Sequence, residues 1–212
     1  MPVEFTPMTS RSSVSHASTI LDQVSIRAAS ANAWTGVQLL SVVFVTVLTA
    51  VAAQVSFPLP FTPVPFTLQP MIVLVGGAAL GARLGFTSQA LYLLAGIAGL
   101  PVFAASGTLP QGFLRLLGPT GGFLMAYPFA AFVAGNLAER GFDRRYATSV
   151  LAMGAGLAII FACGVAWMAF GTPHLGLSAA IAGGLVPFIP ADLFKIAASA
   201  TVLPMAWRFL RR

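Results

Sequence analysis

Long apolar segments, separated by short polar or proline-containing ones, fill this 212-residue chain from about residue 37 onward. A helix needs roughly 20 apolar residues to cross a bilayer, so the chain has room for up to six or seven crossings. The segments predict six helices, at about 37–53, 71–80, 86–99, 121–138, 147–170 and 190–210. The pattern therefore predicts an all-α, polytopic membrane protein.

The segments outside the predicted helices differ in what they can form. Residues 57–70 contain five prolines, which lack an N–H and restrict the preceding residue, so a structured loop or an extended cap is expected. This loop should lie at an interface or line a cavity, because its unpaired carbonyls would be costly against lipid. Residues 102–119 and 171–188 predict further loops. The Ser- and Thr-rich residues 1–33 predict a loosely ordered extension before a single domain, 34–212.

Composition and charge support the membrane interpretation and orient the chain. The sequence is 58% hydrophobic and 8% charged, whereas soluble domains are about 45–50% apolar and about 25% charged. The net charge of +6 is a topology signal, since basic residues gather in cytoplasmic loops. Six crossings place these arginines on the side of both termini: Arg11, Arg27, Arg83, Arg140, Arg144, Arg145, Arg208, Arg211 and Arg212. Only Arg115 falls on the other side, either as a solvated loop residue or as an attraction for an anionic solute, so both termini should be cytoplasmic.

Asp192 and Lys195 are the strongest candidates for chemistry. They lie three residues apart in a helix that Pro190 can begin, so they share one face near its outer end. Charges are costly within a membrane-spanning helix, and pairing lowers that cost. The pair either lines a ligand-sized polar pocket or forms a self-satisfied ion pair that holds the helix end.

Two further segments are candidates for ligand contact. Thr120 predicts an N-cap, and Gly121 and Gly122 would leave backbone N–H groups open to a carboxylate or carbonyl oxygen. The alternative for the two glycines is close helix packing. Thr67 and Gln69 offer donors and acceptors at the mouth of an outward pocket, unless the proline-rich loop is only a rigid connection.

Small residues at spacing four on the first predicted helix allow a close helix contact. They are Thr46 with Ala50 and Thr49 with Ala53. The contact is either with a partner subunit or with another helix of the same chain.

Four ordered segments are similar to motifs of one known family: Val64–Gln69, Leu91–Phe103, Leu117–Gly122 and Pro190–Lys195. They resemble the BioY family, the biotin-binding S components of energy-coupling factor (ECF) transporters. The resemblance covers about residues 37–205. Phe123 and Ala191 depart from the tyrosine and the glycine of the family motifs.

The resemblance implies a six-helix fold with a biotin pocket near the outer face, covered by the loop between the first two helices. Biotin's ureido group would meet Asp192 and Lys195. The implied substrate-binding residues are Thr67, Gln69, Tyr92, Thr120, Gly121, Gly122, Phe123, Asp192 and Lys195. The first helix would face a transmembrane coupling subunit driven by paired ABC-type ATPases, and the binding subunit would topple in the membrane to release biotin inward.

The sequence leaves two other functions open. A nucleotide-binding loop and an ion relay are both absent from it, so uptake needs an outside energy source, or the chain alone equilibrates its solute. A membrane enzyme using Asp192, Lys195 or His174 would need a nucleophile or metal beside a base, which the sequence does not show. We therefore expect no enzyme activity, no cofactor and no metal, with biotin as the transported ligand.

Overall fold

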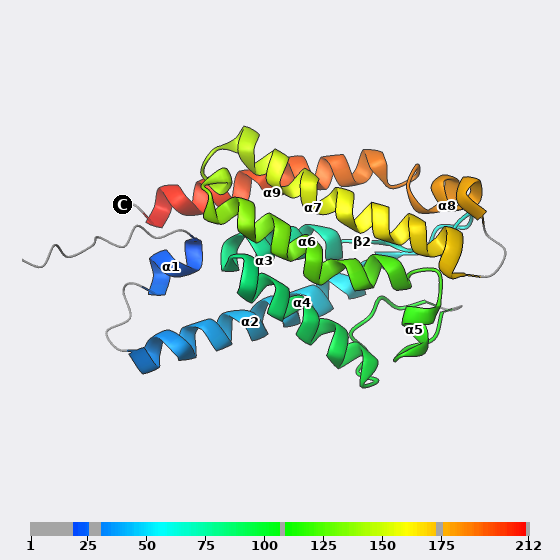
Figure 1. Ribbon diagram of the computed structural model, residues 1–212, viewed down its shortest axis with the longest axis horizontal. Coiled ribbons are helices and arrows are strands. Elements are labelled where there is room, and N and C mark those ends of the chain that lie inside the picture. Colours follow the sequence, from blue (N-terminus) through cyan, green and yellow to red (C-terminus); the bar gives the residue numbers. More distant parts are fainter. Residues whose placement is uncertain (1–18, 26–30, 107–108, 173–175, 211–212) are drawn as a thin grey trace, which may run out of the picture.

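The computed structural model describes residues 19–25, 31–106, 109–172 and 176–210, and it is almost entirely helical (Figure 1). The elements are α1 (Ile20–Ser25), α2 (Ala31–Gln54), β1 (Ser56–Phe57), β2 (Phe66–Thr67), α3 (Gln69–Leu80), α4 (Ala82–Ile97), α5 (Leu114–Leu117), α6 (Gly121–Glu139), η1 (Phe142–Arg144), α7 (Tyr146–Ala166), η2 (Trp167–Gly171), α8 (Gly176–Gly184) and α9 (Ile189–Leu210). Five residues singled out from the sequence lie outside these ranges: Arg11, Arg27, His174, Arg211 and Arg212.

Four helical segments of the described chain are long and apolar enough to cross a membrane. They are Trp34–Gln54, Gly121–Glu139, Tyr146–Gly171 and Ile189–Leu210. Their bounds agree with the predicted segments to within a few residues. The last turn of the third segment is the π-helix η2. The sequence therefore predicted the long helices correctly.

Two shorter helices, α3 and α4, form a hairpin at Gly81. The predicted break at 81–85 occurs at Gly81 alone, where φ is 88°, a conformation that glycine adopts at little cost. Helix α4 resumes at once because the Ala82 N–H donates to Glu139 Oε1 at 2.8 Å. The 12 residues of α3 span only about 18 Å, against a hydrocarbon core of about 30 Å. Helix α3 is therefore too short to cross a bilayer by itself.

Helix α6 is the centre of the bundle, packed against α3, α4 and α7 (Figure 1). Its buried positions are mostly alanine and glycine, and the alanine side chains are almost fully buried. A methyl group at Gly77 of α3 would lie 2.5 Å from the carbonyl oxygen of Ala131. Small residues thus let the helix backbones approach closely, which is how membrane helices gain packing energy.

Three predicted irregular segments are partly helical. Residues 176–184 form α8, which packs against η2, and residues 114–117 form α5. These stretches contain no proline, so nothing in them prevents a helical turn. Within the segment predicted as an N-terminal extension, residues 20–25 and 31–33 are helical. In α1, Thr19 and Asp22 each accept a hydrogen bond from the other's backbone N–H at 3.1 Å.

The small residues of α2 pack within this chain. Thr46 Oγ1 donates to the Ser88 carbonyl at 2.8 Å, and Gln89 Nε2 donates to Thr49 Oγ1 at 3.2 Å. Ala53 is fully buried and Ala50 is partly buried. Thr46, Thr49, Ala50 and Ala53 thus form a contact with α3 and α4 within the chain, because a threonine hydroxyl in a bilayer seeks a nearby carbonyl. Their partner-docking role stays a prediction.

Candidate functional site

Asp192 and Lys195 form a buried ion pair in the first turns of α9. Lys195 Nζ lies 2.7 Å from Asp192 Oδ1, and the two residues are only 7% and 4% exposed. Lys195 Nζ also donates to the Thr67 carbonyl at 2.6 Å and lies 3.6 Å from the centre of the Phe66 ring. The lysine therefore joins α9 to strand β2 of the proline-rich loop. The pair is self-satisfied in this state, which was the alternative left open by the sequence.

The proline-rich loop is a structured cap, as its sequence predicted. Strands β1 and β2 pair antiparallel, with Ser56 opposite Thr67 and Phe57 opposite Phe66. The tip of the loop is held by Thr62, whose Oγ1 donates to the Gly183 carbonyl of α8 at 2.8 Å. The cap is thus attached to α8 at its tip and to α9 at its base.

Two small cavities lie beneath this cap. The larger, about 40 Å³, is lined by Val64, Pro65, Thr67, Gln69, Phe103, Ala104, Arg115, Thr120, Phe123, Leu124 and Tyr127. The smaller, about 10 Å³, is bordered by Asp192, Lys195, Ser199 and apolar side chains of α3 and α7. Pockets that hold small molecules measure about 300–1,000 Å³. Each cavity is therefore smaller than the ligand-sized hollow that was expected beside the pair.

Arg115 is the most important residue whose role the sequence left open, as either a solvated loop residue or an attraction for an anionic solute. In the structure it is 1% exposed and lines the larger cavity. Its guanidinium donates to the Ala104 carbonyl at 2.9 Å and to the Leu109 carbonyl at 3.3 Å. Burial lowers the pKa of Arg115 from its ordinary value, yet a guanidinium stays charged in proteins. A positive charge thus lies at the wall of the cavity.

The turn before α6 contributes side chains rather than an open helix end. Thr120 makes no side-chain cap, and its buried hydroxyl faces the larger cavity without a hydrogen-bond partner. A methyl group at Gly121 would collide with the Leu116 carbonyl, and one at Gly122 with Trp167. Close packing, the alternative that the sequence left open, is therefore present at both glycines, and their binding role stays a prediction. Phe123 lines the cavity as expected.

Gln69 and Tyr92 are neighbours, but only Gln69 lines the cavity. Gln69 Nε2 donates to the Tyr92 hydroxyl at 2.6 Å, and that hydroxyl donates to the Val102 carbonyl at 3.2 Å. Tyr92 is fully buried and packs edge-on against Phe103. Tyr92 therefore positions Gln69 from behind, while Thr67 and Gln69 face the cavity.

Three buried polar atoms around the cavities have no hydrogen-bond partner among the described residues: Arg115 Nε, Thr120 Oγ1 and Ser199 Oγ. An unsatisfied buried group costs about 1–3 kcal/mol, so a cluster of them indicates a place that a polar ligand completes. Ser199 was missed, although it lies four residues after Lys195 and on the same helix face. Tyr127 was missed as well, and it lies within electrostatic reach of both Asp192 and Arg115.

The arrangement suits binding rather than catalysis. One pole, Asp192 with Lys195, offers both an acceptor and a donor. The other pole, Arg115, offers a cation, and Tyr127 lines the same cavity as Arg115. The other walls of that cavity are largely aromatic and aliphatic. A ligand with a neutral hydrogen-bonding head, an apolar middle and an anionic tail would satisfy every part.

Comparison with known proteins identifies the family. Residues 25–212 match the BioY family. The chain is 40% identical over 156 residues to the probable biotin transporter BioY of Pyrococcus horikoshii, covering 74% of this chain and 86% of that protein. It is 39% identical over 165 residues to the biotin transporter BioY of Thermotoga maritima, covering 78% and 92%.

A solved structure shows the same fold. The crystal structure of the S-component for biotin from an ECF-type ABC transporter superposes with a TM-score of 0.76 at 24% identity, covering 85% of this chain and 95% of that one. The bundle therefore has the S-component fold, that of a multi-pass membrane protein. With the sequence match across nearly the whole described chain, this protein belongs to the BioY family.

Proposed function

We propose that this protein is the biotin-binding S component of an ECF-type transporter, and not an enzyme. The observation that carries the proposal is the two-pole site beneath the cap. Biotin has a ureido ring at one end and a carboxylate at the other, joined by an apolar thioether ring and alkyl chain. Asp192 and Lys195 match the ureido group, Arg115 matches the carboxylate, and Phe123 and Leu124 line the cavity between the poles.

Binding requires the cap to open and to close again over biotin. In the closed state Lys195 donates to the Thr67 carbonyl, and Thr62 donates to Gly183. Each such bond contributes about 0.5–1.5 kcal/mol, or more where the donor is charged, so both can break reversibly. Opening would join the two cavities, because Thr67 lines one and its partner Lys195 lines the other.

The membrane arrangement follows from charge. We infer six crossings, formed by α2, α3 with its cap, α4, α6, α7 and α9. The turn at Gly81, the α6–α7 turn and the C-terminal end of α9 carry the exposed arginines, which places them on the cytoplasmic side. The cap, α5 and α8 then face outward, where biotin arrives. The two ends lie at opposite extremes of the bundle (Figure 1).

Transport against a gradient needs partners. Since the sequence has no nucleotide-binding loop, and Asp192 is the only acidic residue inside a span apart from Glu139 at the very end of α6, energy must come from elsewhere. We infer a transmembrane coupling subunit with paired ABC-type ATPases, in agreement with the transporter class of the solved structure.

The test is calorimetric titration of the purified full-length protein in detergent. Biotin should bind at one molecule per chain, and riboflavin should give no binding heat. Vesicles that contain this chain alone should not accumulate biotin above the outside concentration. No heat with biotin would refute the binding role, and equilibration of biotin by the chain alone would indicate a solitary facilitator.

A further inference from the structure

A second hollow lies on the outer surface of the bundle, between α4 and α6. This groove has a volume of about 520 Å³ and is lined by Arg83, Phe86, Thr87, Phe129 and Phe132. It shares no lining residue with the two cavities beneath the cap. Phe86 and Phe129 meet edge to face, with ring centres 5.7 Å apart, and form a firm aromatic wall. The groove is thus a preformed apolar surface, separate from the substrate site.

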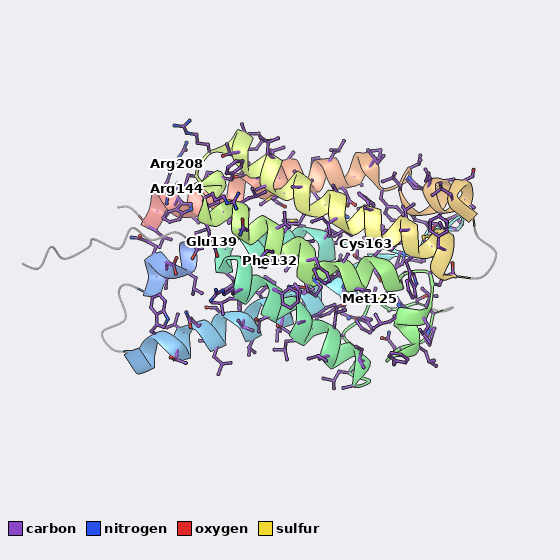
Figure 2. All side chains as sticks on the ribbon, in the orientation of Figure 1. Met125, Phe132, Glu139, Arg144, Cys163 and Arg208 are labelled. Carbon is purple, nitrogen blue, oxygen red and sulfur yellow. The ribbon has the colours of Figure 1, made fainter. Side chains whose placement is uncertain are left out.

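The groove continues along α6 toward the outer end. A neighbouring groove of about 560 Å³ shares Phe129 and includes Met125, Cys163 and Phe170. Figure 2 shows Phe132 toward the Glu139 end of α6, with Met125 and Cys163 toward the other end. Met125, Phe129 and Phe132 are spaced four and three residues apart, so they share one face of the helix. The two hollows therefore form one apolar path from the cytoplasmic end into the middle of the membrane.

Arg83 stands at the cytoplasmic mouth of this path. It is the second residue of α4, directly after the Gly81 turn, and its side chain is exposed. Within the described part of the chain, its guanidinium has no ion-pair or hydrogen-bond partner. The nearby Glu139 carboxylate is instead engaged with the Ala82 N–H. Thr87 donates to the Arg83 carbonyl at 2.9 Å, which satisfies the one hydroxyl in the groove.

We propose that this groove binds an anionic phospholipid of the cytoplasmic leaflet. The lipid phosphate contacts the Arg83 guanidinium, and one acyl chain lies along Phe132, Phe129 and Met125. The charge decides the occupant: an apolar helix of another protein would cover an unpaired guanidinium and leave it without a partner, at a considerable cost. A phosphate at headgroup level provides that partner, and the aromatic groove receives the chain.

The experiment is native mass spectrometry of the full-length protein in detergent, with equal amounts of phosphatidylglycerol and phosphatidylcholine that carry the same acyl chains. Wild-type protein should retain about fivefold more phosphatidylglycerol, equivalent to about 1 kcal/mol for one basic residue at an anionic surface. Arg83→Gln should bring the ratio to about one. Arg208→Gln, at an exposed arginine of α9 at the same end of the bundle (Figure 2), should keep the wild-type ratio.

Two further measurements separate the groove from a general effect of charge. Thr87→Trp, at an exposed position of the groove wall, leaves Arg83 in place but fills the groove, and should lower retention of both lipids. Excess glycerol phosphate, which has the headgroup chemistry without chains, should not displace the bound lipid. Equal retention of the two lipids by wild-type protein, or an equal loss in Arg208→Gln, would overturn the proposal. Unchanged biotin affinity in Arg83→Gln would show that the variant is folded and that the two sites are separate.

Discussion

Replacing Arg115 with glutamine should reduce affinity for biotin much more than affinity for biotin methyl ester. In the structure this guanidinium is buried at the cavity wall, holds the Ala104 and Leu109 carbonyls, and leaves Nε without a partner. A hydrogen bond to a charged group contributes about 1.5–3 kcal/mol. Loss of the contact with the carboxylate should therefore weaken biotin binding by about 10- to 150-fold.

The comparison with the methyl ester separates the carboxylate contact from the other effects of the substitution. Arg115→Gln also weakens two bonds to loop carbonyls, and that effect should be the same for both ligands. The measurement is a double cycle of four dissociation constants, by titration calorimetry, in which the interaction energy isolates the carboxylate contact. Wild-type protein should bind the ester more weakly than biotin, and the variant should bind both about equally. An equal loss of affinity for biotin and for its methyl ester would show that Arg115 does not contact the carboxylate, and it would refute the two-pole site.

Three other changes test the cap, the pair and the packing. Asp192→Asn should weaken biotin by about 1–3 kcal/mol in the same titration, and unchanged affinity would exclude Asp192 from the site. Thr62→Val removes the bond to Gly183 and should speed biotin release about fivefold in a radioligand chase, for about 1 kcal/mol lost; an unchanged rate would show that the cap tip is not a latch. Gly122→Leu should lower thermal stability by about 1–3 kcal/mol, whereas Gly154→Leu, where a side chain meets nothing within 4 Å, should not; equal melting temperatures would contradict the packing role.

The long helices could be predicted from the sequence because the bilayer imposes a simple rule of length and apolarity. The Gly81 break was predicted for the same reason, because the apolar segment around it is too long for one crossing. The break occurs at a glycine, which takes a φ of 88° readily. Helix α8 could not be predicted in this way. Its nine residues are too few to cross a membrane, and it is stabilised by contact with η2 rather than by its own sequence.

The site was predicted only in part because sequence spacing reports neighbours along one helix. Asp192 and Lys195 were found since they are three residues apart, and their pairing is confirmed. The burial of Arg115 could not be predicted because it depends on Ala104 and Leu109, which come from an irregular segment. The inward direction of Thr46 and Thr49 could not be distinguished from an outward one, since both faces of α2 are apolar.

On the proposed function, the buried pair also gives a physical basis for selecting a ureido group. In the structure Lys195 donates to both the Asp192 carboxylate and the Thr67 carbonyl. When the cap opens, the lysine loses a neutral carbonyl acceptor, and it needs a ligand that supplies another. A ureido group supplies that carbonyl oxygen, and its N–H groups can donate to Asp192, which accepts but cannot donate when ionised. A ring without an amide group would leave Lys195 without its second acceptor and Asp192 without a donor from the ligand. A carboxylate at the same place would repel the Asp192 carboxylate. On the proposed function we therefore expect the ureido oxygen to replace the Thr67 carbonyl as the acceptor for Lys195, so ligands that lack a carbonyl beside an N–H should bind much more weakly than biotin in the same titration.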